Sequence, residues 1–276
     1  MIRKIDMHMH STSSDGQYTP AELVYKAKEN DIELMALTDH DTVDGLKEAV
    51  ECVRNTGITF VPGIEISTQD SEEIHILGYG VDKNNHDLRS FCDEFKEARL
   101  KRGQVICDYL SGLGIYIDYD DIKKKAPNGL IARPLFAEWM QDHGIVSTRK
   151  EAFKLYLDTP EFREATERKK PDGMTSVSLI HKAGGKAVLA HPGLYRMDTD
   201  EKESLVKRLK DCGLDGIECL YSKHTKEERD IYLEWARKYD LKISCGSDFH
   251  GEKVKPDVKM GMEFDQTLYG EQLILL

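Results

Sequence analysis

The chain has 276 residues, of which 39% are hydrophobic and 32% are charged, and its formal net charge at pH 7 is −11. This length supports one sizeable hydrophobic core with an insertion, and the acidic balance excludes a broad surface that coats nucleic acid. No apolar run approaches the ~20 residues that a membrane span needs. The N-terminus lacks a signal-peptide core, so we expect a cytoplasmic protein whose six cysteines are free thiols.

Short apolar runs alternate with amphipathic stretches along much of the chain. The runs predict strands over residues 2–7, 32–37, 58–64, 74–81, 186–190, 214–220 and 241–245. The stretches between them predict helices over residues 20–30, 43–55, 175–183, 200–211 and 226–239. Gly184 and Gly213 are expected to end two of these helices in a left-handed conformation. This alternation predicts an α/β protein with a mainly parallel sheet, and seven strands favour a barrel.

Residues 83–172 interrupt this alternation. They are rich in charge and in helix formers, and they contain no convincing strand. We therefore expect a barrel domain of residues 1–82 and 173–276, with residues 83–172 as a helical insertion that caps the mouth of the barrel. The alternative is a solvated helical decoration without a functional role.

Histidines and carboxylates gather at the ends of the predicted strands. Because a parallel barrel brings the C-terminal ends of its strands to one face, we expect these side chains to meet in space. A single histidine such as His75 is more often a core residue than a ligand, so the prediction depends on joint placement. The candidate ligands are His8, His10, Asp15, His40, Glu65, His75, His191, Asp248 and His250.

The residue types indicate which ligand this face would bind. Imidazole nitrogen and carboxylate oxygen suit Zn²⁺, Mn²⁺ and Fe²⁺. In a strand, His8 and His10 point to the same face and can bind one ion, while Glu65 can bridge two ions. Nine candidates are too many for one metal, so the sequence predicts two or three ions. Bound metals would also reverse the local charge and admit a small anionic substrate.

These motifs resemble those of the polymerase and histidinol phosphatase (PHP) family. The matching segments are Asp6-Met7-His8-Met9-His10-Ser11, Thr38-Asp39-His40-Asp41, Gly63-Ile64-Glu65, His75, Leu189-Ala190-His191-Pro192 and Ser247-Asp248-Phe249-His250-Gly251, with Ile131-Ala132-Arg133-Pro134 in the insertion. The resemblance implies a distorted seven-stranded (β/α)7 TIM-like barrel and a trinuclear site for Mn, Fe or Zn. It assigns the first metal to His8, His10, Glu65 and Asp248, the second to Glu65, His75 and His191, and the third to Asp15, His40 and His250.

Two departures from the family pattern bear on the substrate. Asp15 stands where the histidinol phosphate phosphatase branch commonly has a histidine, which favours the branch that acts on nucleotides. Leu135 stands where relatives often carry a histidine, which leaves the substrate contacts of that loop open.

Contacts to a phosphate need cations or hydrogen-bond donors. Arg133 is the first candidate because a guanidinium group matches two phosphate oxygens, and the family resemblance adds His224 as a donor to the phosphate or the leaving oxygen. Together with Asp248 they form the predicted catalytic set. Arg102 is a further phosphate-binding candidate, although an arginine on a charged helix is usually solvated surface.

Two acidic residues, Asp39 and Asp41, permit two interpretations. They either orient ligating histidines from behind or cap the helix that begins near Val43.

The resemblance implies a metal-dependent phosphoesterase in which a hydroxide held between metals attacks phosphorus. The expected substrate is a nucleoside monophosphate, a 3′,5′-bisphosphate or the 5′ end of a short oligonucleotide. The alternatives are a cyclic sugar phosphate and histidinol phosphate. A non-catalytic PHP accessory domain is a further alternative, and an amidohydrolase-type barrel fits less well because no convincing metal-bridging lysine is present. We expect no long nucleic-acid surface and no membrane contact, and the oligomeric state stays open.

Overall fold

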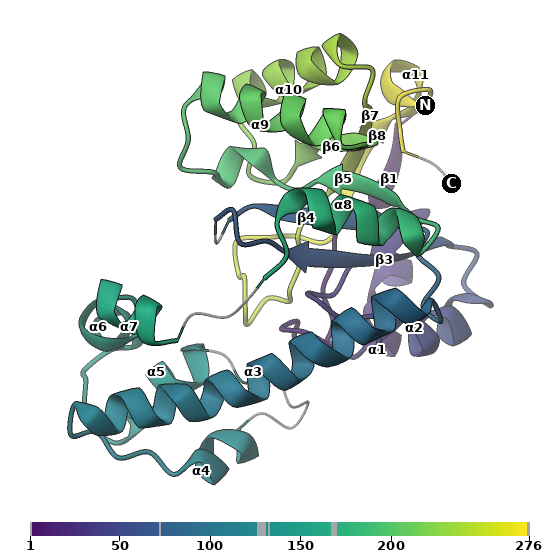
Figure 1. Cartoon of the computed structure of the whole chain (residues 1–276). Helices are drawn as coiled ribbons and strands as arrows, with labels where there is room; N and C mark the ends of the chain where they lie inside the picture. The colour runs from purple at the N-terminus through teal and green to yellow at the C-terminus, as the bar shows by residue number, and fades with distance from the viewer. Residues whose placement is uncertain (1, 72, 126–130, 132, 167–169, 275–276) are drawn as a thin grey trace. The chain divides into compact units, whose positions relative to one another are not determined.

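The computed structural model describes residues 2–71, 73–125, 131, 133–166 and 170–274 (Figure 1). The chain divides into two units, the first made of Met1–Cys92 with Lys170–Leu276 and the second of Asp93–Lys169. The first boundary lies later than the predicted residue 83. The reason is that helix α3 (His86–Gly112) begins with Leu88 and Cys92 buried in the core of the first unit.

Eight strands of the first unit form one sheet in the order β7-β6-β5-β4-β3-β2-β1-β8. All seven predicted strands are confirmed. They are β1 (Ile2–Asp6), β2 (Leu34–Leu37), β3 (Thr59–Ser67), β4 (His75–Tyr79), β5 (Lys186–Leu189), β6 (Gly216–Tyr221) and β7 (Lys242–Gly246). The eighth, β8 (Met262–Asp265), was not predicted and pairs antiparallel with β1. It has four residues, of which only Phe264 is buried, so its sequence carries too short an alternation to be recognised.

One strand departs from the expected parallel arrangement. β4 runs antiparallel to both β3 and β5, whereas the other pairings among β1 to β7 are parallel. The connection between β3 and β4 spans only residues 68–74. A link of this length is too short for a parallel crossover, so the chain must reverse direction.

The barrel is closed by the segments that follow β1 and β7. The Met7 N–H donates to the Cys245 carbonyl at 2.9 Å, and the Asp248 N–H donates to the His8 carbonyl at 2.8 Å. These bonds join the first and the last strand of the barrel. The structure therefore confirms the seven-stranded barrel, with β8 attached to β1 as an additional strand.

The helices of the first unit cover the strands from outside (Figure 1). Helix α10 (Lys226–Lys238) packs on β6 and β7, α8 (Gly173–Lys182) on β4 and β5, and α2 (Leu46–Val53) on β3. Helix α1 (Pro20–Glu29) begins with a capping box, in which the Glu22 N–H donates to Thr19 Oγ1 at 3.2 Å and the Thr19 N–H donates to Glu22 Oε2 at 2.9 Å. Gly184 and Gly213 have φ values of +78° and +100°, which confirms the predicted left-handed caps. Besides these helices and the start of α3, the first unit contains α9 (Thr199–Asp211), α11 (Gln266–Tyr269) and the short 3₁₀ turn Pro192–Leu194.

The second unit has its own hydrophobic core, and its described residues contain no strand. Leu110, Phe136 and Phe162 are fully buried in it. Besides the greater part of α3, its helices are α4 (Tyr119–Lys124), α5 (Arg133–Asp142), α6 (Arg149–Ala152), the π-helical turn Phe153–Leu157 and α7 (Pro160–Ala165). The insertion is thus helical as predicted, and its role as a cap stays a prediction.

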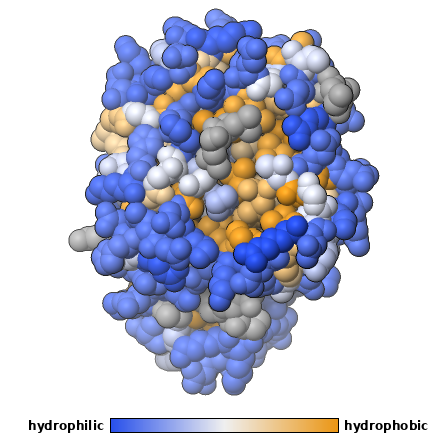
Figure 2. Space-filling view, turned by 90° about the vertical axis from the view of Figure 1, so that its right-hand side faces the viewer, coloured by the Kyte–Doolittle hydropathy of each residue, from blue (hydrophilic) through white to orange (hydrophobic). Residues whose placement is uncertain are grey.

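Hydrophilic residues prevail on the face shown in Figure 2, around a hydrophobic area. All six cysteines are free thiols, as expected. Within the described ranges, we find no helix with the combination of length and hydrophobicity that a transmembrane span requires.

A set of contacts ties the loop after β7 to the loop after β1. The Tyr18 hydroxyl donates to Glu252 Oε2 at 2.6 Å, and Lys26 Nζ lies 2.9 Å from Glu252 Oε1. The Gln17 N–H donates to the His250 carbonyl at 2.7 Å. The hydrogen bonds from Tyr18 and Lys26 lower the pKa of Glu252 to about 2. The two loops are therefore held together by an ionised carboxylate.

Closure of the barrel predicts that Gly246 tolerates no side chain. A Cβ at this position would lie 2.3 Å from His8 Cβ and 2.8 Å from Glu218 Oε1. We expect Gly246→Ala to lower the free energy of unfolding by about 1–3 kcal/mol through overpacking, as measured by urea denaturation. The control is Gly112→Ala, where a Cβ meets nothing within 4 Å, and which should leave the stability unchanged or slightly raised. Equal stabilities of the two variants would contradict the close packing.

The link through Glu252 predicts a pH-dependent stability. Its folded-state pKa of about 2 lies below the ordinary 4.5, so its stabilising contribution is present above pH 4.5 and is lost as the pH falls towards 2. We expect Glu252→Gln to be less stable than wild type at pH 7 by roughly 0.2–1 kcal/mol, because the pair is solvent-exposed. The gap between urea midpoints should narrow as the pH is lowered from about 5.5 towards 3.5. A gap that stays constant over this range would argue against the link.

Candidate metal centre

The centre of the site is Glu65, a fully buried carboxylate on β3. Each of its oxygens faces imidazole nitrogens. Oε2 lies 3.2 Å from His8 Nε2, 3.2 Å from His10 Nε2 and 3.0 Å from His40 Nδ1, and Oε1 lies 2.9 Å from His75 Nδ1 and 2.9 Å from His191 Nε2. One carboxylate thus joins five histidines that come from four strands or strand ends, because His8 and His10 both follow β1.

A second carboxylate, Asp248, follows β7 and uses its two oxygens differently. Oδ1 lies 3.3 Å from His10 Nε2 and 3.3 Å from His250 Nδ1. Oδ2 accepts from the Tyr221 hydroxyl at 2.9 Å and from Lys255 Nζ at 2.7 Å. One oxygen therefore points into the histidine cluster, while the other is held by two donors.

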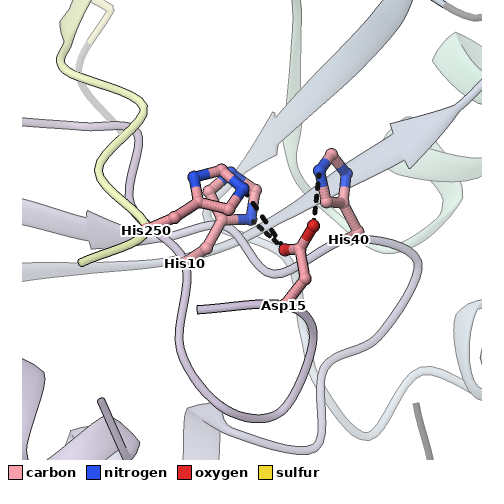
Figure 3. A group of neighbouring side chains, drawn as sticks. All are labelled: His10, Asp15, His40 and His250. Carbon is pink, nitrogen blue, oxygen red and sulfur yellow. Dashed lines mark ion pairs between the residues drawn. The ribbon is translucent and has the colours of Figure 1, made fainter. Parts of the chain in front are cut away.

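The third carboxylate, Asp15, lies between two sets of histidines (Figure 3). Its Oδ1 is 3.2 Å from His250 Nε2 and 3.8 Å from His10 Nδ1, and its Oδ2 is 3.9 Å from His40 Nε2. The Asp15 side chain is 43% exposed, whereas the side chains of His10 and His250 are buried. Asp15 is therefore the most exposed of the nine ligands.

All nine predicted ligands come together, and four sets of them are tight enough to hold a cation. Within each set the ligand atoms lie within 4.8 Å of one another. The sets are His10 with Asp15, His40 and His250; His8 with Glu65 and His191; His8 with His10 and Asp248; and His40 with Glu65 and His75. The predicted sets were three, and the four sets found divide the ligands differently. His10 also joins Asp15, Glu65 is not in the set of His8, His10 and Asp248, and the predicted partners His75 and His191 fall into separate sets with His40 and His8.

The unsatisfied atoms of the cluster fit a metal. The buried atoms without a hydrogen-bond partner include His8 Nε2, both ring nitrogens of His10, His40 Nδ1, His191 Nδ1 and Glu65 Oε2. Buried polar atoms that lack partners cost free energy, and several of these lie close to an oxygen without the alignment of a hydrogen bond. Nitrogen and oxygen donors at such spacing suit Zn²⁺, Mn²⁺ or Fe²⁺. The residues present therefore fit divalent metal ions.

Charge coupling inside the cluster is strong. Burial by itself would raise the pKa of Glu65, but His40 and His8 hold it well below its ordinary value. Burial would lower the pKa of His10, but Asp248 and Glu65 raise it to about 9. The pKa of His40 is well below normal because burial outweighs the nearby carboxylates. Metal ions would take the place of the protons that the raised groups hold, so binding should release protons.

The turns that present the ligands have unusual backbones and buried supports. Asp41, His191 and Asp248 have φ values of 56°, 29° and 62°. Such left-handed conformations of non-glycine residues cost roughly 1–3 kcal/mol each and are typical of functional sites. Below the turns, the buried Asp6 accepts from the Ser247 N–H at 2.9 Å and so ties the end of β1 to the segment after β7.

Asp39 and Asp41 support the loops of the site. Asp39 accepts from the Ser11 N–H at 2.7 Å and from Ser14 Oγ at 2.6 Å, and Asp41 accepts from the Ser67 N–H at 2.8 Å. The interpretation as helix caps is wrong, because the N-cap of α2 is Gly45 and forms no side-chain cap. The helix begins at Leu46, and both carboxylates accept hydrogen bonds from serine residues instead. Their contribution is to hold the loops that carry His10 and Glu65.

The predicted substrate contacts are engaged with other groups. His224 Nε2 accepts from the Gly193 N–H at 3.1 Å, so its ring proton is on Nδ1, which faces the Cys219 carbonyl at 3.1 Å. Burial lowers the pKa of His224. In this arrangement the ring has no free donor for a phosphate, and a role as donor would require its rotation.

In the second unit, Arg133 Nη1 donates to Asp158 Oδ1 at 3.2 Å, and Arg102 Nε donates to the Thr166 carbonyl at 3.1 Å. Leu135, the second departure from the family pattern, packs against the core of this unit. The roles of Arg133 and Arg102 towards a phosphate stay predictions.

Sequence reasoning missed three residues of the site: Glu218, Tyr221 and Lys255. Glu218 is fully buried, and its Oε1 lies 3.0 Å from His8 Nδ1. A signal for it exists, since it is the one charged residue in the apolar run 216–221 of β6. Lys255 has no such signal, because it lies in a loop where charged residues are common.

Curated relatives cover nearly the whole chain. A 5′-3′ exoribonuclease of Haemophilus influenzae is 37% identical over 91% of this chain and 91% of its own length. A 3′,5′-nucleoside bisphosphate phosphatase of Chromobacterium violaceum is 34% identical over 90% and 88%. A phosphoribosyl 1,2-cyclic phosphate 1,2-diphosphodiesterase of Eggerthella lenta is 31% identical over 90% and 94%.

Solved structures show the same fold. A Chromobacterium violaceum protein described as an amidohydrolase, with bound sulfate and no metal, has a TM-score of 0.80 and 33% identity over 95% of this chain and 91% of its own. A putative metal-dependent phosphoesterase of Bifidobacterium adolescentis has a TM-score of 0.79 and 27% identity over 98% and 96%. The profile of the PHP domain family matches residues 6–212. By this match, and by relatives more than 30% identical along nine tenths of its length, the chain belongs to the PHP domain family.

Proposed function

We propose that this chain is a metal-dependent phosphoesterase, a hydrolase that acts on a small phosphate ester. The observation that carries the proposal is the cluster of six histidines and three carboxylates around Glu65, with buried ring nitrogens that lack hydrogen-bond partners. The names of the relatives support the same reaction class. We further propose that the cluster holds three divalent ions, which are Mn, Fe or Zn.

Bound divalent metals supply activated water and neutralise the charge of phosphoryl oxygens. The residues of the chain prepare the site for this chemistry. Glu65 belongs to two of the ligand sets, and in each of them one histidine faces Oε2 and one faces Oε1, so the carboxylate can serve both sets. Tyr221 and Lys255 fix Asp248, so that its Oδ1 stays turned towards the histidines. The Lys255 side chain is 32% exposed, and its ammonium adds positive charge where an anionic substrate would approach.

The substrate that we propose is a nucleotide, either a nucleoside monophosphate, a 3′,5′-bisphosphate or the 5′ end of a short oligonucleotide. A nucleoside bisphosphate phosphatase and a 5′-3′ exoribonuclease are both among the relatives. The net charge of −11 disfavours contact with long nucleic acid. Asp15 is the residue that distinguishes the chain from the histidinol phosphate phosphatase pattern. We therefore regard histidinol phosphate as an inferior substrate.

A cyclic sugar phosphate is the second candidate substrate. It is favoured by the Eggerthella lenta relative, whose name gives a phosphoribosyl cyclic phosphate. The same cluster would act on a strained cyclic diester, because the phosphoryl group is the common recognition element.

Removal of metal tests the proposed function. The purified protein with added Mn²⁺ should release phosphate from a nucleoside 3′,5′-bisphosphate and from a generic aryl phosphate. Treatment with a strong chelator should abolish both activities, and Mn²⁺ should restore them, because the proposed reaction needs water that is activated by bound metal. Turnover that survives complete removal of metal would exclude the mechanism. Retained metal without turnover of any phosphate would favour an accessory domain.

In the same assay, a panel separates the substrate classes. It contains a nucleoside monophosphate, a 5′-phosphorylated short oligonucleotide, a cyclic sugar phosphate and histidinol phosphate. The highest kcat/KM should fall on one of the nucleotides, and a preference for the cyclic ester would select the second candidate.

Arg133 and Arg163 form a matched pair for testing the predicted phosphate contact. Both donate to Asp158 Oδ1, at 3.2 Å and 3.0 Å, and only Arg133 is a predicted substrate ligand. We expect Arg133→Ala to lower kcat/KM roughly 10- to 100-fold, the loss typical of a hydrogen bond to a charged group. Arg163→Ala should stay near wild type, and the metal content of both should be unchanged. If both variants lose the same factor in kcat/KM, the loss comes from the disturbed Asp158, which both arginines contact, and not from a phosphate contact of Arg133.

A further inference from the structure

We propose that Glu218 is a positioning residue of the metal centre, which fixes His8 in the tautomer that presents Nε2 to a metal and holds the backbone of His191. The inference deepens the proposed function and rests on it. Glu218 lies on β6, and its side chain is fully buried. It belongs to none of the four ligand sets found among the described residues.

Both oxygens of Glu218 contact residues that are predicted metal ligands. Oε1 lies 3.0 Å from His8 Nδ1, and Oε2 accepts from the His191 N–H at 2.7 Å. Space for Oε1 is provided by Gly246, where a Cβ would approach this oxygen to 2.8 Å. The carboxylate therefore links ligands that follow β1 and β5 from a position on a third strand.

The contact with His8 decides its tautomer. An ionised carboxylate only accepts hydrogen bonds, so His8 must donate its proton from Nδ1. In the neutral ring Nε2 is then a bare lone pair. This atom lies 3.2 Å from Glu65 Oε2 and has no hydrogen-bond partner. A carboxylate behind a histidine also makes the ring a more basic ligand.

The contact with His191 stabilises a strained turn. The backbone of His191 has φ 29° and ψ 55°, a left-handed conformation that is costly for a residue with a side chain. A charge-assisted hydrogen bond from its N–H to Glu218 offsets part of that cost. The turn directs His191 Nε2 to within 2.9 Å of Glu65 Oε1. Glu218 therefore sets the ring of one ligand and the backbone of another.

The variant Glu218→Gln tests this role with little change of volume. The glutamine oxygen can still accept from the His191 N–H, but its amide presents a donor to His8 Nδ1. His8 would then have to accept at Nδ1 and carry its proton on Nε2, the atom required for the metal. We expect the affinity for Mn²⁺, measured by competition with a chelator, to fall about 10- to 100-fold, as for other residues behind metal ligands. The control Glu263→Gln, at an exposed position on β8, should bind Mn²⁺ like wild type.

A spectroscopic measurement on the wild-type protein keeps the inference testable even where the variant does not fold. In protein labelled with ¹⁵N-histidine and loaded with Zn²⁺, His8 should show a protonated Nδ1 and a metal-bound Nε2. Its signals are assigned by their absence in His8→Gln. Coordination of His8 through Nδ1 would overturn the proposal.

Neither measurement depends on turnover, so the two proposals fail in different ways. Wild-type protein that binds no divalent metal would overturn the proposed function and this inference together. Wild-type protein that binds Mn²⁺ with the same affinity as Glu218→Gln would overturn the role of Glu218 alone.

Discussion

The structure depends on one buried carboxylate that faces five imidazoles. Glu65 has no access to solvent, and its two oxygens lie 2.9 to 3.2 Å from ring nitrogens of histidines at five different places in the chain. A buried charge is tolerated only where partners compensate it. The strands of the barrel must therefore deliver all five rings to one point. The register does so: His40 bridges to Glu65 from the end of β2, and His75 pairs with Ser67, two residues beyond Glu65 on the same face of β3.

The rule that strand ends share one face of a barrel explains why most of the site can be predicted from sequence. His8, His40, His191 and Asp248 each follow a strand that runs in the common direction. His75 breaks the rule, because it is the first residue of its strand, where a parallel barrel would place it at the opposite end. Because β4 runs antiparallel to its neighbours, its N-terminal end lies at the same end of the barrel as the C-terminal ends of the other strands. The sequence argument counted His75 among the candidates because it lies in a strand beside the others, but only the reversal of β4 explains how it reaches them.

What could not be predicted depends on atoms that meet across long sequence separations. Glu218 and His8 are 210 residues apart, and nothing in the sequence says which ring nitrogen the carboxylate contacts. The hydrogen bond from the Gly193 N–H to His224 Nε2 likewise depends on the conformation of a loop, which the sequence does not reveal. Asp39 and Asp41 had two plausible roles because a short acidic side chain before a helix is an ordinary capping signal. Their actual partners are the Ser11 and Ser67 backbones, which only the folded barrel brings near.

These supports imply that the metal-free barrel holds its site open at a cost in stability. Asp41, His191 and Asp248 keep left-handed backbones, and several buried nitrogens have no partner. The barrel fold itself does not require this strain, since hydrophobic residues at the same strand ends would fold with less backbone strain and fewer unpaired polar atoms. Cations that bind the folded site, and not the unfolded chain, stabilise the folded protein because they coordinate the unpaired atoms. The same residues that reduce the stability of the empty protein therefore increase its affinity for metal, and Glu218 contributes to both because it fixes one ligand ring and one strained turn.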